Sequence, residues 1–299
     1  MDKGQIRRNI KELAKRMLKG GRGLALLVLL LPALISLGFT ALDKLVAIGL
    51  GYAPATPLEV LMLDWRYSLL STLLSIGGML ISIPLAFGVR DWYVELGAGN
   101  KETLGYVFGW FSTTQRFWRA IGQTLLIGLR SFLWALLFAV PLVAAMAGAV
   151  FSGMFVLTGT DMWRYGYDPE YVLAALGVLW PVILLYLAWC AVVGIWLMRY
   201  AAAPYILVRH PDWSVRESIS ESIAVMRGHR IEYAVFTLSF FGWFLLAPFT
   251  LGLLLLWLLP YFFESTALFF QYVEDAYSIP GAAGPLDQTN ITEGTDTHE

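Results

Sequence analysis

Long apolar stretches, separated by short polar ones, dominate the chain and set its expected architecture. A helix needs about 20 apolar residues to cross the ~30 Å hydrocarbon core of a bilayer. Four stretches meet this length, and the pattern predicts spans at Leu24–Leu42, Tyr67–Val89, Phe117–Gly153 and Val172–Val208. A fifth stretch, Tyr233–Val273, contains a single charged residue and is too long for one crossing. It predicts two crossings joined by a turn at residues 247–250.

The composition places this apolar content in a membrane. The chain has 299 residues, of which 58% are hydrophobic and 14% charged. A soluble domain has about 45–50% apolar and about 25% charged residues. The predicted fold class is therefore all-α, a polytopic membrane helical bundle with six transmembrane helices plus amphipathic helices at the cytoplasmic surface.

The distribution of positive charge predicts the orientation. Most of the 21 Lys and Arg residues lie in residues 1–23 and in the polar stretches after the second and fourth predicted spans. Short cytoplasmic loops carry such an excess. We therefore expect a multi-pass protein of the bacterial cytoplasmic (inner) membrane with both termini in the cytoplasm. The net charge of −1 excludes a globally basic nucleic-acid binder.

The N-terminal residues 1–23 are predicted to form a basic amphipathic helix. Ile6, Ile10, Leu13 and Met17 recur at helical spacing, and Lys and Arg occupy the other faces. Such a helix suits the anionic inner leaflet, so membrane lipids are the expected partners. A solvated lead-in that only sets topology is the alternative. Residues 24–273 would form the six-span domain, and residues 274–299 a disordered acidic tail.

A polar segment connects the fourth and fifth predicted spans. Ser214 and Glu217 form the S-x-x-E pattern of a capping box, and Gly228 suits a left-handed helix end. Both plain connecting structure and a regulatory or partner-binding role are open for this helix. In the loop after the second span, the aromatic residues of 106–111 predict another short helix.

The search for catalytic groups finds no motif of nucleophilic, phosphate-binding or zinc-dependent chemistry. The histidines are His210, His229 and His298, and the acids near the first two are better explained as helix caps. We therefore expect no enzyme activity, no catalytic residues, no metal and no cofactor. Ser71, Ser75 and Ser82 in the second span are expected to mark close helix packing.

Two ionisable residues lie within predicted spans, where such residues are rare and often functional. Arg130 in the third span and Glu264 in the sixth lie at similar predicted depths and carry opposite charges. We predict that they face the interior and pair. The alternative is that Arg130 extends to the interface while Glu264 contacts a polar cavity or water.

Several motifs follow one another in a characteristic order: RYAAAPYIL from Arg199, SVRESISESIAVMRGHR, LSFFGW, and LPY at residues 259–261. They resemble the bacterial integral membrane family called domain of unknown function 975, over most of residues 6–273. The layout is more remotely similar to the membrane domain of some glycerophosphodiester phosphodiesterases. The resemblance implies no activity, because the family is uncharacterised. The motif residues that carry it are Arg199, Pro204, Tyr205, Gly228, Gly242, Trp243, Pro260 and Tyr261.

These observations favour a non-enzymatic scaffold or accessory factor in envelope or lipid homeostasis. The alternative is a transporter or lipid-handling protein with an intramembrane polar site, which predicts a cavity lined by Arg130, Glu264, Ser or Thr. Protein partners are not predicted by the sequence.

Overall fold

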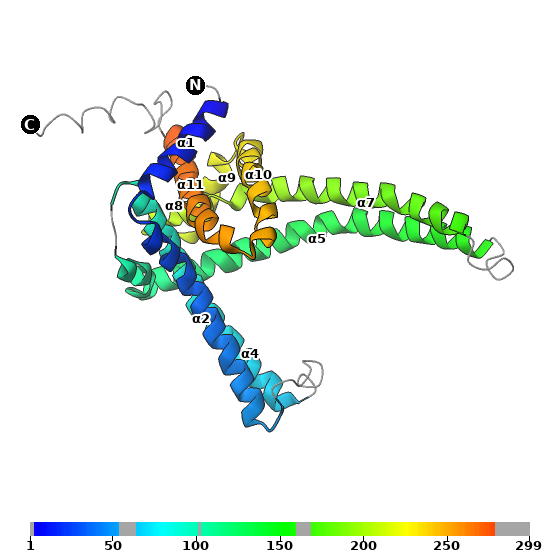
Figure 1. Ribbon diagram of the computed structural model, residues 1–299, viewed down its shortest axis with the longest axis horizontal. Helices are drawn as coiled ribbons and strands as arrows, with labels where there is room; N and C mark the ends of the chain where they lie inside the picture. Colours follow the sequence, from blue (N-terminus) through cyan, green and yellow to red (C-terminus); the bar gives the residue numbers. More distant parts are fainter. Residues whose placement is uncertain (1–2, 54–63, 101–102, 160–168, 279–299) are drawn as a thin grey trace, which may run out of the picture. The chain divides into compact units, whose positions relative to one another are not determined.

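The computed structural model describes residues 3–53, 64–100, 103–159 and 169–278, and every regular element in these ranges is a helix. The all-α prediction is confirmed. Within these ranges, six helical segments are long and apolar enough to cross a membrane. The longer helices are α1 (Lys3–Met17), α2 (Arg22–Gly49), α4 (Trp65–Gly97), α5 (Thr114–Gly159), α7 (Pro169–Leu197), α9 (Val215–Val225), α10 (Arg230–Leu246) and α11 (Leu253–Ser278) (Figure 1). The short elements are the 3-10 helices η1 (Leu104–Phe111), η2 (Met198–Tyr200) and η3 (Pro248–Thr250) and the helix α8 (Ala203–Arg209).

The chain divides into two compact units, residues 1–125 with 200–299 and residues 126–199. The second unit consists of most of α5 together with α7. Its two helices are joined by aromatic contacts, with the Trp134 and Trp196 rings 5.1 Å apart. The Trp189 indole N–H donates to the Phe138 carbonyl at 2.9 Å. Many of its leucines are exposed, as expected for helices that face lipid.

In the first unit, α2 and α4 form a long antiparallel hairpin. Phe39 packs against Gly78, and the Tyr67 hydroxyl donates to the Asp43 carboxylate at 2.6 Å. Both helices run past their predicted ends, because a polar residue on a helix does not by itself end it. Arg90, expected in a loop, is therefore a helical residue of α4.

The 3-10 helix η1 lies against the C-terminal part of α4. A Cβ at Gly88 would meet the Val107 carbonyl oxygen at 1.7 Å, so glycine permits this approach. The Trp110 indole N–H donates to Asp91 at 2.9 Å and fixes the register. The short aromatic helix predicted in this loop is confirmed as η1.

The N-terminal helix is shorter than predicted. It ends at Met17, and a turn with Gly20 at φ +91° leads into α2. The most buried residues are Ile6, Ile10 and Ala14 on the helix and Leu18 directly after it, so the apolar stripe runs through Ala14 and Leu18 rather than Leu13 and Met17. Helix α1 packs on α11 and, to a smaller extent, on α4, which means that protein rather than lipid covers this stripe.

The cap of α9 agrees with the sequence. The Glu217 backbone N–H donates to the Ser214 hydroxyl at 3.2 Å, and the Ser214 backbone N–H donates to the Glu217 carboxylate at 2.7 Å. The helix ends at Val225, three residues before Gly228, which has the expected left-handed φ of +94°.

The predicted turn between the last two apolar helices is confirmed at η3. The boundary at residue 274 was placed too early, because α11 continues to Ser278 and includes Glu274 and Asp275. Residues 279–299 of the predicted tail lie outside the described residues.

Candidate functional site

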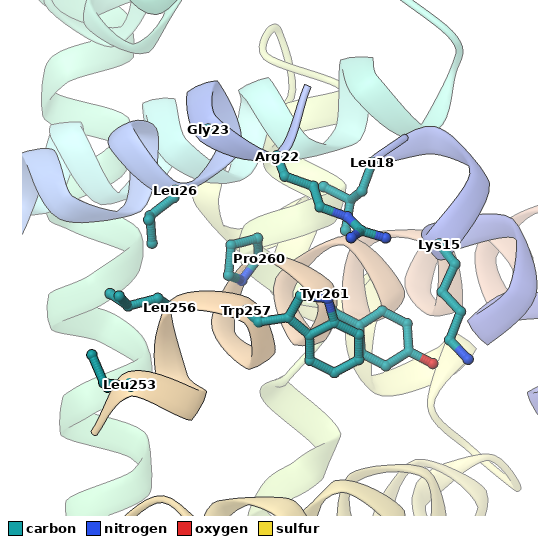
Figure 2. A pocket seen from close by; sticks show the side chains of 10 residues that line it. All are labelled: Lys15, Leu18, Arg22, Gly23, Leu26, Leu253, Leu256, Trp257, Pro260 and Tyr261. Carbon is teal, nitrogen blue, oxygen red and sulfur yellow. The ribbon is translucent and has the colours of Figure 1, made fainter. Parts of the chain in front are cut away.

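A pocket of about 230 Å³ lies between the end of α1, the start of α2 and the first half of α11 (Figure 2). The chain turns at Gly20 between α1 and α2, and this turn lets both helices contribute to one wall. Pro260 and its neighbours on α11 form the other wall. The lining residues are Lys15, Leu18, Arg22, Gly23, Leu26, Leu253, Leu256, Trp257, Pro260 and Tyr261.

The charge in this pocket is concentrated at one end. Among the described residues that line it, Lys15 and Arg22 are the charged ones, and the Lys15 ammonium lies 5.6 Å from the centre of the Tyr261 ring. Figure 2 shows both cations and the Tyr261 hydroxyl toward one end, and the leucines of α2 and α11 toward the other. A site with this polarity fits an amphiphile that has an anionic head and an apolar chain.

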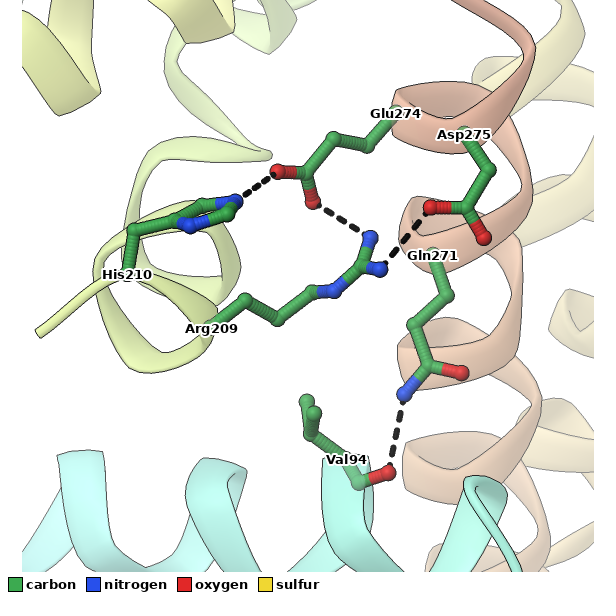
Figure 3. Close-up of polar contacts among 6 residues, drawn as sticks. All are labelled: Val94, Arg209, His210, Gln271, Glu274 and Asp275. Atoms are coloured by element: carbon green, nitrogen blue, oxygen red, sulfur yellow. Dashed lines mark hydrogen bonds and ion pairs between the residues drawn. The ribbon is translucent and has the colours of Figure 1, made fainter. Parts of the chain in front are cut away.

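A second cluster joins α8 to the end of α11 by ion pairs (Figure 3). Arg209 Nη1 lies 2.7 Å from Glu274 Oε2, and Arg209 Nη2 lies 2.8 Å from Asp275 Oδ1. His210 Nε2 lies 2.9 Å from the other oxygen of Glu274. One turn earlier on α11, Gln271 donates to the Val94 carbonyl at 2.9 Å and adds α4 to the cluster.

Sequence reasoning missed this cluster because it assigned Glu274 to the tail. The sequence did contain a signal for this cluster. Glu274 and Asp275 follow the last apolar stretch, and Arg209 follows the fourth apolar stretch. His210 was expected to be near helix-capping acids. Instead its ring stacks on Trp213, 4.3 Å between centres, and contacts Glu274. In the ranges that the structure describes, no three His, Cys, Asp or Glu side chains are grouped as a metal site.

The predicted intramembrane residue Glu264 is fully buried in the first unit. Neither carboxylate oxygen has a hydrogen-bond partner among the described residues. Its nearest described aromatic neighbours on other helices include Tyr93, whose ring lies 5.8 Å from that of the adjacent Phe263, and Tyr205, which packs on Phe270 of the same helix. Arg130 belongs to the second unit and is partly exposed. Arg130 and Glu264 belong to different units, so their pair stays a prediction.

A polar groove runs along the α2–α4 hairpin and was not expected. Its volume is about 290 Å³, and one carboxylate oxygen of Asp43 next to it has no hydrogen-bond partner in the described part of the chain. Asp43 was missed because the first span was ended at Leu42. The remaining lining residues are Ser36, Phe39, Thr40, Ser71, Leu74, Ser75, Gly78 and Ser82.

The family-motif residues have mainly architectural positions. Pro204 occupies the first turn of α8, and Tyr205 packs on Phe270 with 4.8 Å between ring centres. The Arg199 guanidinium lies 4.7 Å from the Trp196 ring centre. Gly242 and Trp243 lie on α10, where the Trp243 side chain is exposed, and Pro260 and Tyr261 line the pocket.

The family model described as "Protein of unknown function (DUF975)" matches residues 1–276, which is most of the chain. The chain belongs to the DUF975 family. The match includes every helix from α1 to α10 and nearly all of α11, so the pocket and the ion-pair cluster lie inside the family region. No curated protein and no solved structure matches the chain. The remote similarity to the phosphodiesterase membrane domain therefore rests on layout alone.

Proposed function

We propose that this DUF975 protein is a non-enzymatic accessory protein of the bacterial cytoplasmic membrane that binds a phospholipid with an anionic headgroup. The pocket between α1, α2 and α11 carries the proposal, because it places two cations at one end of an apolar cavity. The six helices of membrane-spanning length and apolarity support a multi-pass protein.

The chemistry of the pocket matches a phosphate group and the first part of a chain. Arg22 and Lys15 offer several N–H donors to phosphate oxygens, and charge-assisted hydrogen bonds of this kind are strong. Leu26, Leu253 and Leu256 offer apolar contact to methylene groups. A cavity of about 230 Å³ is below the usual range of about 300–1,000 Å³ for sites that enclose a whole ligand. The remainder of the lipid would stay in the bilayer.

The orientation follows from the positive charge at the N-terminus. Basic residues of α1 flank the pocket, and cytoplasmic loops carry an excess of such residues. In this proposal the pocket lies at the inner leaflet, where anionic lipids attract basic segments by about 1 kcal/mol per residue. Both chain ends are cytoplasmic in this proposal.

The test is native mass spectrometry of the protein purified in mild detergent. The wild-type protein should retain phospholipid, mainly anionic. The double variant Lys15→Gln/Arg22→Gln should lose most of it. The matched control Arg8→Gln/Arg16→Gln removes the same charge from exposed positions of α1 and should retain it. Equal loss in both double variants, or no lipid on the wild-type protein, would show that the pocket is not a lipid site.

The polar groove of the α2–α4 hairpin favours a second candidate function, transport of a polar solute. The groove has the hydroxyl lining that such a pathway requires, with Asp43 as its charged group. In a Cys190→Ala background, Ser75→Cys should react with a water-soluble methanethiosulfonate, while Leu73→Cys on the exposed apolar face should not. If neither position reacts, the groove holds no water and the transport reading fails.

A further inference from the structure

The α10–α11 hairpin lies beside the basic helix α1. Lys3 Nζ is 3.9 Å from Glu232 Oε2 at the start of α10. Lys11 Nζ is 2.5 Å from Ser239 Oγ and 4.4 Å from the Phe240 ring centre. Lys15 then reaches the Tyr261 ring on α11. Helix α1 therefore follows the hairpin from its open end toward its turn.

This position matters because α1 cannot lie in hydrocarbon. A Lys or Arg at the centre of a bilayer costs about 2.5–3.5 kcal/mol on insertion scales. Helix α1 and the turn after it expose most of their basic side chains, so the segment belongs in water or among headgroups. The exposed ones are Lys3, Arg8, Lys15, Arg16 and Lys19, and the exposed Arg22 follows at the start of α2.

The turn of the hairpin lies near the beginning of α2. Leu253, which follows the turn, lines the same pocket as Arg22 and Leu26. Helix α11 contacts α4 near the C-terminal end of α4, where the rings of Phe263 on α11 and Tyr93 on α4 are 5.8 Å apart. In the first unit, the rest of the α2–α4 hairpin extends away from α11 (Figure 1).

Both helices as a whole have the length and apolarity of a span, but the apolar part of each arm between the turn and the first charged residue is short. Helix α10 has 17 residues, and its apolar part starts after Glu232, which leaves about 21 Å of helix at ~1.5 Å per residue. On α11 the apolar part before Glu264 is about 16 Å long by the same rise. Apolar runs of about 10–14 residues are typical of re-entrant or interfacial segments. Helix α2, by contrast, has 28 residues and is long enough to cross the bilayer.

The turn itself presents an apolar surface. Leu251 is 93% exposed and Phe249 is 84% exposed, and Leu253 is exposed beside them. Trp243 and Trp257 lie one to two helical turns behind, on opposite arms, where rings of this type favour the headgroup region. This arrangement suits a turn whose exposed apolar residues lie among the acyl chains of one leaflet, with one Trp of each arm at the headgroups of the same leaflet.

We infer that α10 and α11 form a re-entrant hairpin, which inserts its turn into the leaflet nearest α1 and returns without crossing. Both helices are long and apolar enough to cross, but their contacts with α1 hold them at the level of that leaflet. The hairpin keeps the chain ends on one side, as two crossings would. The inference does not depend on lipid binding in the pocket.

Crosslinking in native membranes tests this placement, with all variants made in a Cys190→Ala background. A short bifunctional maleimide should join Leu26→Cys to Leu253→Cys, since both positions line one pocket. It should not join Gly51→Cys, beyond the far end of α2, to Leu253→Cys. The control pair Phe39→Cys/Gly78→Cys, which is in contact within the α2–α4 hairpin, should crosslink.

The result depends on which pair reacts. Crosslinking at Leu26 without crosslinking at Gly51 supports the re-entrant hairpin. Crosslinking at Gly51, or no product at Leu26 while the control pair reacts, overturns it. The crosslinking result would be the same if the purified protein retained no lipid. Conversely, retained lipid is measured on the wild-type protein by mass spectrometry, whichever pair crosslinks.

Discussion

The Arg209 guanidinium, at the end of α8, lies 2.7 Å from the Glu274 carboxylate near the end of α11. Glu274 is 5% exposed and contacts His210 through its second oxygen. Two segments that are distant in the sequence are thereby fixed to each other at one end of the first unit. A buried carboxylate that loses its partners is costly, so this cluster should matter for stability.

Replacing Glu274 with Gln should destabilise the protein by about 2–3 kcal/mol, the upper range for hydrogen bonds to charged groups. The amide keeps the size of the side chain but removes its charge from both Arg209 and His210. Thermal unfolding in detergent measures the change. Asp275→Asn is the matched control, because Asp275 is more exposed and makes one ion pair with Arg209. A larger loss from Asp275→Asn than from Glu274→Gln would contradict the assigned importance of Glu274.

The capping box of α9 should make this helix sensitive to acid. Hydrogen bonds from Ser214 hold the pKa of the Glu217 carboxyl below its usual range. Because the folded pKa is depressed, the stabilisation is fully present above the ordinary Glu pKa of about 4.3. It is lost as the pH falls through the lower folded value. Protection of the α9 amides in hydrogen exchange, corrected for intrinsic rates, should decrease in that range.

Two variants separate the cap from general acid unfolding. Glu217→Gln should remove the pH dependence of α9 protection, because the amide does not titrate. Ser214→Ala should lower α9 stability by about 1 kcal/mol at neutral pH, the usual cost of losing an N-cap. If Glu217→Gln keeps the same acid profile as the wild-type protein, another group causes the loss.

Gly88 should not tolerate a side chain. An alanine Cβ would meet the Val107 carbonyl oxygen at 1.7 Å, so η1 would have to move away from α4. Overpacking of this kind costs about 1–3 kcal/mol. Gly122→Ala is the matched helical control, since its Cβ would meet only the Val215 side chain at 3.7 Å. Thermal unfolding should show a decrease for Gly88→Ala and little change or a gain for Gly122→Ala.

The sequence predicted the elements of this fold better than their environments. Apolar stretches gave the six long helices, and the S-x-x-E pattern gave the start of α9 at Ser214. These signals are local, so one chain segment contains all of the information. The helix ends were less accurate, because polar residues such as Asp43 and Arg90 can continue a helix: Asp43 accepts from Tyr67 on α4, and Arg90 donates to the Ala86 carbonyl one turn earlier.

The candidate sites depended on contacts between distant segments and were mostly missed. No local pattern links Lys15 to Tyr261 or Arg209 to Glu274. The stripe on α1 shows the same limit, because helical spacing predicted an apolar face while the packing against α11 selected Ala14 and Leu18 for burial. Among the predicted intramembrane residues, Glu264 is buried as an interior residue should be, and its partner stays a prediction.

A charge exchange tests the predicted pair of Arg130 and Glu264. Each single change, Arg130→Glu or Glu264→Arg, should lower the yield of folded protein, because it leaves two like charges in an apolar environment. The double variant should recover much of the yield if the side chains pair. Fluorescence-detected size-exclusion chromatography of a C-terminal fluorescent fusion measures the folded fraction. Glu264→Gln serves as the reference for losing the charge alone. If the double variant is no better than the worse single variant, Glu264 interacts with its neighbours Tyr93 and Tyr205 rather than with Arg130.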